Sequence, residues 1–179
     1  MVYDHAMNDF AHTVDSSLVG ALEVLLFLLD TAEAHIAEHE LAPEELLEAQ
    51  LFADMFPFWR QVASACNVAR RTVDRLGGKE IHDPPRPQPN LATLRTHVHM
   101  TIAYVGDVDR AAVEATAVAS LTAKLGKQPV ELTGSTYLSN FALPNVLFHV
   151  VTAYNILRHR GVAVGKHGYL GPMISRAAL

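Results

Sequence analysis

Two side chains capable of acid–base chemistry stand where their helices should be apolar. In the stretch FALPNVLFHVVTAYNILRHRG, His149 has apolar neighbours on both sides. At about 100° per residue, Val146, Ala153 and Ile156 fall on the same helical face as this histidine. The pattern therefore predicts an imidazole near the middle of an inward-facing helical surface.

Asp54 breaks an apolar pattern in the same way, earlier in the chain. It lies three residues after Leu51 and four before Phe58, on the stripe that runs through both. A lone buried carboxylate is costly, so it normally finds a partner or takes up a proton. A histidine on a facing helix is a suitable partner, because the carboxylate binds one ring nitrogen and raises the basicity of the other. We predict that Asp54 and His149 form a hydrogen-bonded pair, direct or through one water.

Two interpretations of this pair stay open. Buried polar groups usually satisfy each other, so the pair can be purely structural, in a non-catalytic or ligand-binding dimeric bundle. Alternatively, the pair is a general base on the floor of a pocket that binds or transforms a small molecule. Whether the protein is an enzyme is left open, and the sequence identifies no substrate. The residues expected to line such a pocket are Met55, Phe58, Trp59, Gln61 and Asn145.

Long amphipathic helices must position these residues. Apolar side chains recur at spacings of three and four, which is the periodicity of a helix with one buried face. Pro57 interrupts one of these stripes, and a kink is expected just before it because proline lacks an amide hydrogen. Asn90 is a plausible helix cap. The predicted helices cover residues 16–39, 43–76, 91–105 and 136–159.

The remaining segments are connections. Residues 77–90 form a proline-rich loop, and residues 161–173 form a glycine-rich tail. The sequence of residues 107–134 predicts a short helical turn, followed by at most a short β-hairpin around Gly126 and Lys127. The chain is therefore expected to be a single all-α domain over residues 1–179, a four-helix bundle with one long crossing connection.

Composition narrows the classes of function. Half of the 179 residues are hydrophobic, 18% are charged and the net charge is −5, which argues against disorder and against a nucleic-acid partner. Cys66 is the single cysteine, and the N-terminus lacks the pattern of a secretion signal. The most apolar run is interrupted by Glu23 and closed by Asp30, so no membrane partner is expected. We expect a cytoplasmic protein.

Two longer stretches, DMFPFWRQVASACNVAR and FALPNVLFHVVTAYNILRHRGVAVGKHGYLG, resemble a known family. The family is a domain-of-unknown-function branch of the DinB/YfiT-like metalloenzyme superfamily. The similarity covers the second to fourth predicted helices and the tail. It implies an up-down-down-up bundle and frequent dimerisation. Phe10, Phe27 and Tyr154 are not needed by the inner stripes, so we expect a homodimer that uses an exposed apolar patch.

The resemblance also implies a divalent metal, which many relatives hold with three histidines. One lies on the second helix, and two lie one turn apart on the last. Here His149 can stand for one ligand, but Asn145 and Ala153 occupy the positions one turn away, and the second helix offers Asp54. Zinc and nickel prefer several imidazole or thiolate ligands. We therefore predict no cofactor and no metal site, although a site made of aspartate, histidine and water stays open.

Overall fold

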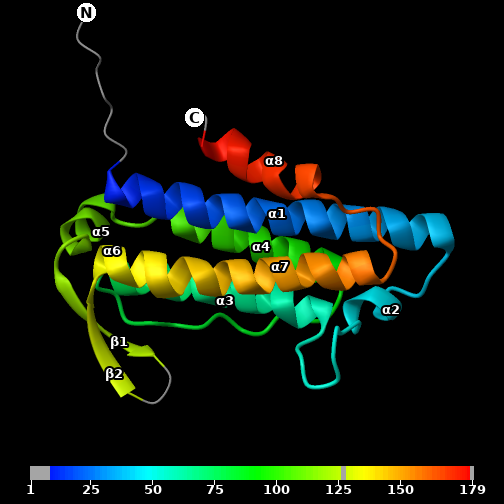
Figure 1. Ribbon diagram of the computed structural model, residues 1–179, viewed down its shortest axis with the longest axis horizontal. Helices are drawn as coiled ribbons and strands as arrows, with labels where there is room; N and C mark the ends of the chain where they lie inside the picture. Colours follow the sequence, from blue (N-terminus) through cyan, green and yellow to red (C-terminus); the bar gives the residue numbers. More distant parts are fainter. Residues whose placement is uncertain (1–8, 126–127, 178–179) are drawn as a thin grey trace, which may run out of the picture.

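The computed structural model describes residues 9–125 and 128–177, and its long helices form a four-helix bundle (Figure 1). α1 and α7 run in one direction, and α3 and α4 run in the opposite direction. The predicted all-α bundle is therefore confirmed, with the up-down-down-up arrangement. These four helices are α1 (Phe10–His39), α3 (Phe58–Leu76), α4 (Leu91–Gly106) and α7 (Leu143–His159).

α1 is the longest helix, and it begins six residues earlier than the sequence predicts. Asp9 caps it, because its carboxylate accepts a hydrogen bond of 2.6 Å from the His12 amide. At the other end, Glu40 takes the left-handed conformation with φ of 54° and closes the helix. By length and composition alone α1 could span a membrane, and 56% of its most apolar window is buried in the bundle.

The predicted helix over residues 43–76 is wrong as a single element. The structure has a short helix α2 (Glu44–Leu47), a non-helical segment, and then α3. Pro57 accounts for the part of this break next to α3, because it cannot donate a helical hydrogen bond and it disfavours helical geometry at the residue before it. The chain instead turns back, and the Phe58 amide donates to the Ala49 carbonyl at 2.9 Å. Pro57 thus precedes the first residue of α3 instead of kinking a longer helix.

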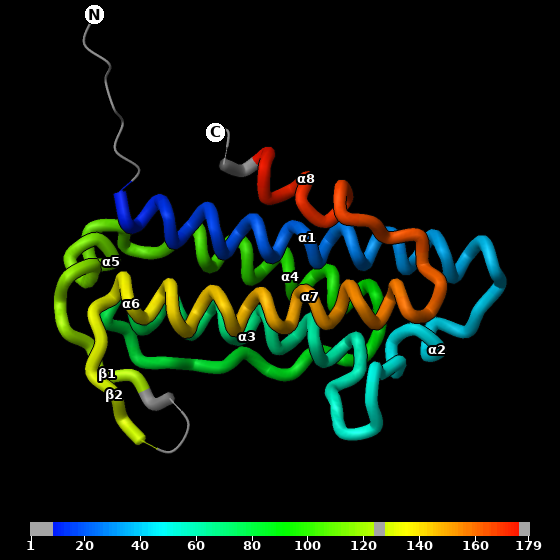
Figure 2. Tube along the Cα trace, viewed as in Figure 1, coloured from blue at the N-terminus to red at the C-terminus, as the bar shows by residue number. Residues whose placement is uncertain are grey.

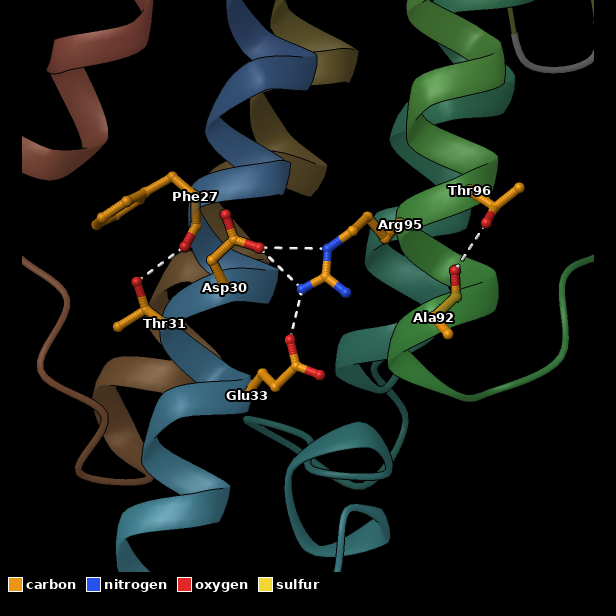
Figure 3. Close-up of polar contacts among 7 residues, drawn as sticks. All are labelled: Phe27, Asp30, Thr31, Glu33, Ala92, Arg95 and Thr96. Atoms are coloured by element: carbon orange, nitrogen blue, oxygen red, sulfur yellow. Dashed lines mark hydrogen bonds and ion pairs between the residues drawn. The ribbon is translucent and has the colours of Figure 1, made fainter.

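α4 begins as predicted, because the Asn90 side chain accepts a hydrogen bond of 2.8 Å from the Thr93 amide. It packs against both α1 and α3. Figure 3 shows Arg95 of α4 reaching across to α1, where its Nη2 donates to Asp30 and to Glu33, each at 2.8 Å. This bridge fixes the pairing of the two helices at the surface, where ion pairs contribute little free energy.

A hairpin separates α4 from the last long helix, as the sequence predicts. It follows α5 (Arg110–Thr116) and pairs β1 (Ser120–Leu125) with β2 (Gln128–Thr133) in antiparallel register. The predicted turn residues, 126 and 127, lie outside the described residues. The chain then enters α6 (Gly134–Tyr137) and a π-helical turn (Leu138–Ala142) that leads directly into α7.

The predicted tail is in fact a helix, α8 (Lys166–Ala177), which lies along α1 (Figure 2). Glycine and proline lower helix propensity, so the sequence gives little sign of it. Gly168 allows the close approach, since a Cβ there would lie 2.3 Å from the Phe27 ring. Phe10, Phe27 and Tyr154 are half-buried and pack against the core, so they are less exposed than expected. The homodimer itself stays a prediction.

Candidate functional site

A groove follows the seam between α3 and α7, where the connection of residues 77–90 runs alongside α3 (Figure 2). It consists of two adjoining hollows of about 400 and 310 Å³, which share Val68, Arg71 and Asn145. The connection contributes Arg86 to the larger hollow and Ile81 to the smaller. The other residues of the larger hollow are Phe56, Arg60, Ala63, Ser64, Asn67 and His149. The other residues of the smaller hollow are Arg75, Tyr137 and Phe141.

His149 lies at this seam, and its partner is Gln61 of α3. The Nδ1 atom of His149 and the Oε1 atom of Gln61 are 2.8 Å apart. The other amide atom of Gln61, Nε2, donates to the Phe56 carbonyl at 3.0 Å, which fixes the orientation of the amide. Because an amide oxygen can only accept, the histidine must carry its hydrogen on Nδ1. Its Nε2 atom is then the free acceptor.

The protonation state of His149 follows from its surroundings. Burial lowers the pKa of the imidazole below its ordinary range. The neutral amide of Gln61 does not stabilise a positive charge as a carboxylate would. We therefore assign a neutral imidazole near neutral pH, with an Nε2 lone pair that can accept a hydrogen bond or a proton.

Asp54 does not occupy the buried helical position predicted for it. It is exposed in the segment between α2 and α3, and the structure gives it no place beside the His149 ring. The prediction assumed that the helix continued through residues 48–57, and the break before Pro57 removes that premise. With solvent around it, the carboxylate has no need of a buried partner.

The other residues predicted to line a pocket are spread over three environments. Asn145 lines both hollows, and Gln61 lies directly behind His149. Phe58 is fully buried in the core, and the Trp59 indole donates to Glu48 at 3.2 Å. Met55 is half-buried in the segment before α3. Phe58, Trp59 and Met55 are not among the described residues that line either hollow.

The residues of α3 that line the groove share one helical face. One face of α3 is polar, because its polar side chains recur at spacings of four, three, four and four. This face lies on the side of α3 opposite the apolar stripe, and it borders the two hollows. A polar face opposite an apolar one is ordinary for an amphipathic helix, and in α3 this outward face is the one on which the two hollows lie. The members of this stripe are Arg60, Ser64, Asn67, Arg71 and Arg75.

A second group of polar side chains lies between α3 and α4. The Tyr104 hydroxyl donates to Asp74 at 2.5 Å, and the Arg70 guanidinium lies 3.8 Å above the Tyr104 ring. His97 is buried beside them, and burial lowers its pKa, with a smaller effect from the Arg70 charge. These groups join the two helices, and none of them is among the described residues that line the two hollows.

Another hollow, of about 370 Å³, lies where the end of α1 meets α2 and the end of α7. The rings of His35 and His39 border it with centroids 4.2 Å apart. It is the chief competitor of the groove as a binding site. The other residues that line it are Leu41, Glu45, Leu46 and Arg160.

Comparison with known proteins identifies the family. The model of a domain of unknown function, DUF1993, matches residues 12–170. The chain belongs to the DUF1993 family. No curated protein matches it. Among solved structures, this DUF1993 protein is similar to a DinB family member from Shewanella denitrificans, with 32% identity and a TM-score of 0.81. The match covers 90% of this chain and 94% of the other, which confirms the predicted place within the DinB-like superfamily.

The three-histidine metal site implied by the resemblance does not fit this DUF1993 chain. Within residues 9–125 and 128–177, no three histidine, cysteine, aspartate or glutamate side chains come together in a way that could hold a metal ion. His149 already uses Nδ1 to bind Gln61, and Asn145 and Ala153 stand one turn away. Neutral amides are weak ligands for zinc or nickel. No chemical step is therefore derived through a metal.

Proposed function

We propose that this protein binds a small molecule in the groove between α3 and α7, with His149 as the hydrogen-bond or proton acceptor at its floor. The observation that carries the proposal is the continuity of the groove. The two hollows share three lining residues, and both combine apolar walls with convergent polar groups, which is the usual character of a ligand site.

The Gln61 and His149 pair supports a specific role for the imidazole. Gln61 is 2% exposed and is itself held by the Phe56 carbonyl, so the ring is oriented before any ligand arrives. Because Nδ1 is engaged, only Nε2 is available to a ligand. A ligand with a hydroxyl or amino group can donate to this atom, and a reaction that needs a base can deliver a proton to it.

Ligand-observed NMR with a library of neutral and charged small molecules tests the proposal. Ser64→Trp fills the larger hollow, and Thr96→Trp places the same side chain on the exposed surface of α4 as a matched control. We expect compounds that bind the parent and Thr96→Trp proteins to lose binding to Ser64→Trp. Asn145→Phe, which narrows both hollows, should act in the same way.

Circular dichroism must show that each variant is folded. If binders keep their affinity for folded Ser64→Trp and Asn145→Phe proteins, the groove is not the binding site. If no compound binds the parent protein, the structural interpretation is favoured, in which Gln61 and His149 only satisfy each other.

A further inference from the structure

The groove concentrates positive charge in a chain whose net charge is −5. Four arginines line the two hollows, and no aspartate or glutamate is among the described lining residues. A cleft lined by one sign of charge raises the local concentration of ligands of the opposite sign. These arginines are Arg60, Arg71, Arg75 and Arg86.

Three of these guanidinium groups have no carboxylate partner among the residues that the structure describes. Arg60 lies 3.6 Å above the Phe56 ring, and Arg75 donates to the Tyr137 hydroxyl at 3.0 Å, so both have neutral partners. Among the described residues, none forms a hydrogen bond or an ion pair with Arg86. Their charge is therefore available to a ligand.

The fourth guanidinium is occupied by a carboxylate from the connection. Arg71 Nε donates to Asp83 Oδ1 at 2.6 Å, and Arg71 Nη2 contacts Asp83 Oδ2, so the pair is bidentate. The side chains are 48% and 42% exposed, and ion pairs at that exposure are weak and screened by salt. An incoming carboxylate or phosphate would present the same pattern of acceptors to Arg71.

Asn67 adds a requirement on the ligand. Its side-chain oxygen is buried, and no described residue donates a hydrogen bond to it. It borders the larger hollow together with Arg60 and Arg71. Buried acceptors normally have a donor, and a hydroxyl or amino group on the ligand would supply one once the side chains that cover this oxygen move aside.

We propose that the groove selects a small anion, whose carboxylate or phosphate group binds Arg71 in place of Asp83 and is flanked by Arg60 and Arg86. This inference rests on the proposed function and names its ligand class. Asp83 is then an internal stand-in for the anion, and its departure removes one contact between α3 and the connection of residues 77–90, while the hydrogen bond from the Lys79 amide to the Asp74 carbonyl remains. A hydroxyl group beside the anion donates to Asn67.

Isothermal titration calorimetry at low ionic strength tests the ligand class. The probes are succinate, malate and inorganic phosphate, with neutral succinamide as the uncharged match of succinate. We expect the anions to bind and succinamide not to bind, with malate severalfold tighter than succinate because of its hydroxyl. Stronger binding of phosphate than of the dicarboxylates would indicate that the ligand is a phosphate ester. Stronger binding of the dicarboxylates would indicate that it is a carboxylic acid. Added salt should weaken binding of every anion.

Variants test the roles of the charged residues. Arg60→Gln and Arg86→Gln should each lower the affinity about tenfold, the effect of one lost charge-assisted hydrogen bond. Arg158→Gln, an exposed arginine of α7 outside both hollows, should have no effect. Asp83→Asn should raise the affinity severalfold, because Arg71 no longer has a competing carboxylate.

Several results would overturn the inference. Anions that bind no better than succinamide would exclude an anionic ligand, and the proposed function would survive if neutral compounds still occupied the groove. Affinities of Arg60→Gln and Arg86→Gln equal to that of Arg158→Gln would place the anion elsewhere. An unchanged or lowered affinity of Asp83→Asn would show that Asp83 does not compete for Arg71.

Discussion

The pair formed by Gln61 and His149 makes a quantitative prediction about stability. Gln61→Leu removes two hydrogen bonds. One joins His149 Nδ1 to Gln61 Oε1 at 2.8 Å, and the other joins Gln61 Nε2 to the Phe56 carbonyl oxygen at 3.0 Å. Each neutral hydrogen bond contributes about 1 kcal/mol, and an unsatisfied buried group adds to the loss. We expect Gln61→Leu to lower the free energy of unfolding by roughly 1–3 kcal/mol.

A double-mutant cycle separates the pair from its surroundings. His149→Phe removes the same hydrogen bond by removing its donor. Adding the stability losses of the two single variants therefore counts this hydrogen bond twice. The double variant should therefore be more stable than the sum predicts, by roughly 0.5–1.5 kcal/mol. Urea denaturation followed by circular dichroism gives the four free energies with the same probe.

Asp54→Leu is the matched control for this cycle. Asp54 is exposed, and combining its substitution with His149→Phe should give additive effects within about 0.5 kcal/mol. Additive losses in Gln61→Leu with His149→Phe would refute the pairing derived from the structure. Coupling between Asp54 and His149 instead would restore the pair expected from the sequence.

Three further predictions concern protonation, reactivity and packing. Burial lowers the pKa of both His149 and His97 from 6.5, so these two histidines bind protons more readily in the unfolded chain than in the folded protein. The free energy of unfolding should therefore be at its full value above about pH 7 and should fall as the pH drops below about 6.5. Phenylalanine at both positions should flatten that fall in urea titrations, and an unchanged slope would contradict the assignment. Burial raises the pKa of the Cys66 thiol to about 12, so iodoacetamide should modify it only after unfolding, as mass spectrometry of the folded and denatured protein would show. Gly168→Ala should lower the free energy of unfolding by roughly 1–3 kcal/mol, because its Cβ would lie 2.3 Å from the Phe27 ring of α1. Gly171→Ala is the control, since a Cβ at this position meets open space and should leave the stability unchanged. Equal melting temperatures of the two variants would contradict the docking of α8 on α1.

Some of the fold could be predicted because local signals agreed with the final packing. The Asn90 cap and the periodicity after it gave α4 almost to the residue, and the hairpin followed from two short segments around a glycine. The apolar periodicity of residues 16–39 predicted the helix α1, although the helix begins six residues earlier, after the Asp9 cap.

The two failures have different causes, one local and one tertiary. The apolar stripe through residues 47–58 is compatible with a helix, but Pro57 cannot donate a helical hydrogen bond, and the Phe58 amide donates to the Ala49 carbonyl instead. The glycines of α8 disfavour a helix in isolation, and packing on α1 overrides that preference.

The site was predicted in part for the same reasons. His149, Gln61 and Asn145 lie on helices whose faces were correctly predicted, and the structure brings them to one seam. Asp54 lay on the segment that broke. The arginines of α3 lie on a polar face that resembles any solvated helix face, and Arg86 comes from a connection whose course no periodicity predicts.

The central claim is that a small molecule binds between α3 and α7, and NMR chemical-shift mapping tests it most directly. The uniformly labelled protein would be titrated with the strongest compound from the library screen. We predict that the amide shifts concentrate in residues 60–71 and 141–149 and in the connection 81–86, whereas the exposed face of α4 and the hairpin stay unchanged. Shifts concentrated around His35, His39 and Arg160 would contradict the account and assign binding to the hollow at the end of α1.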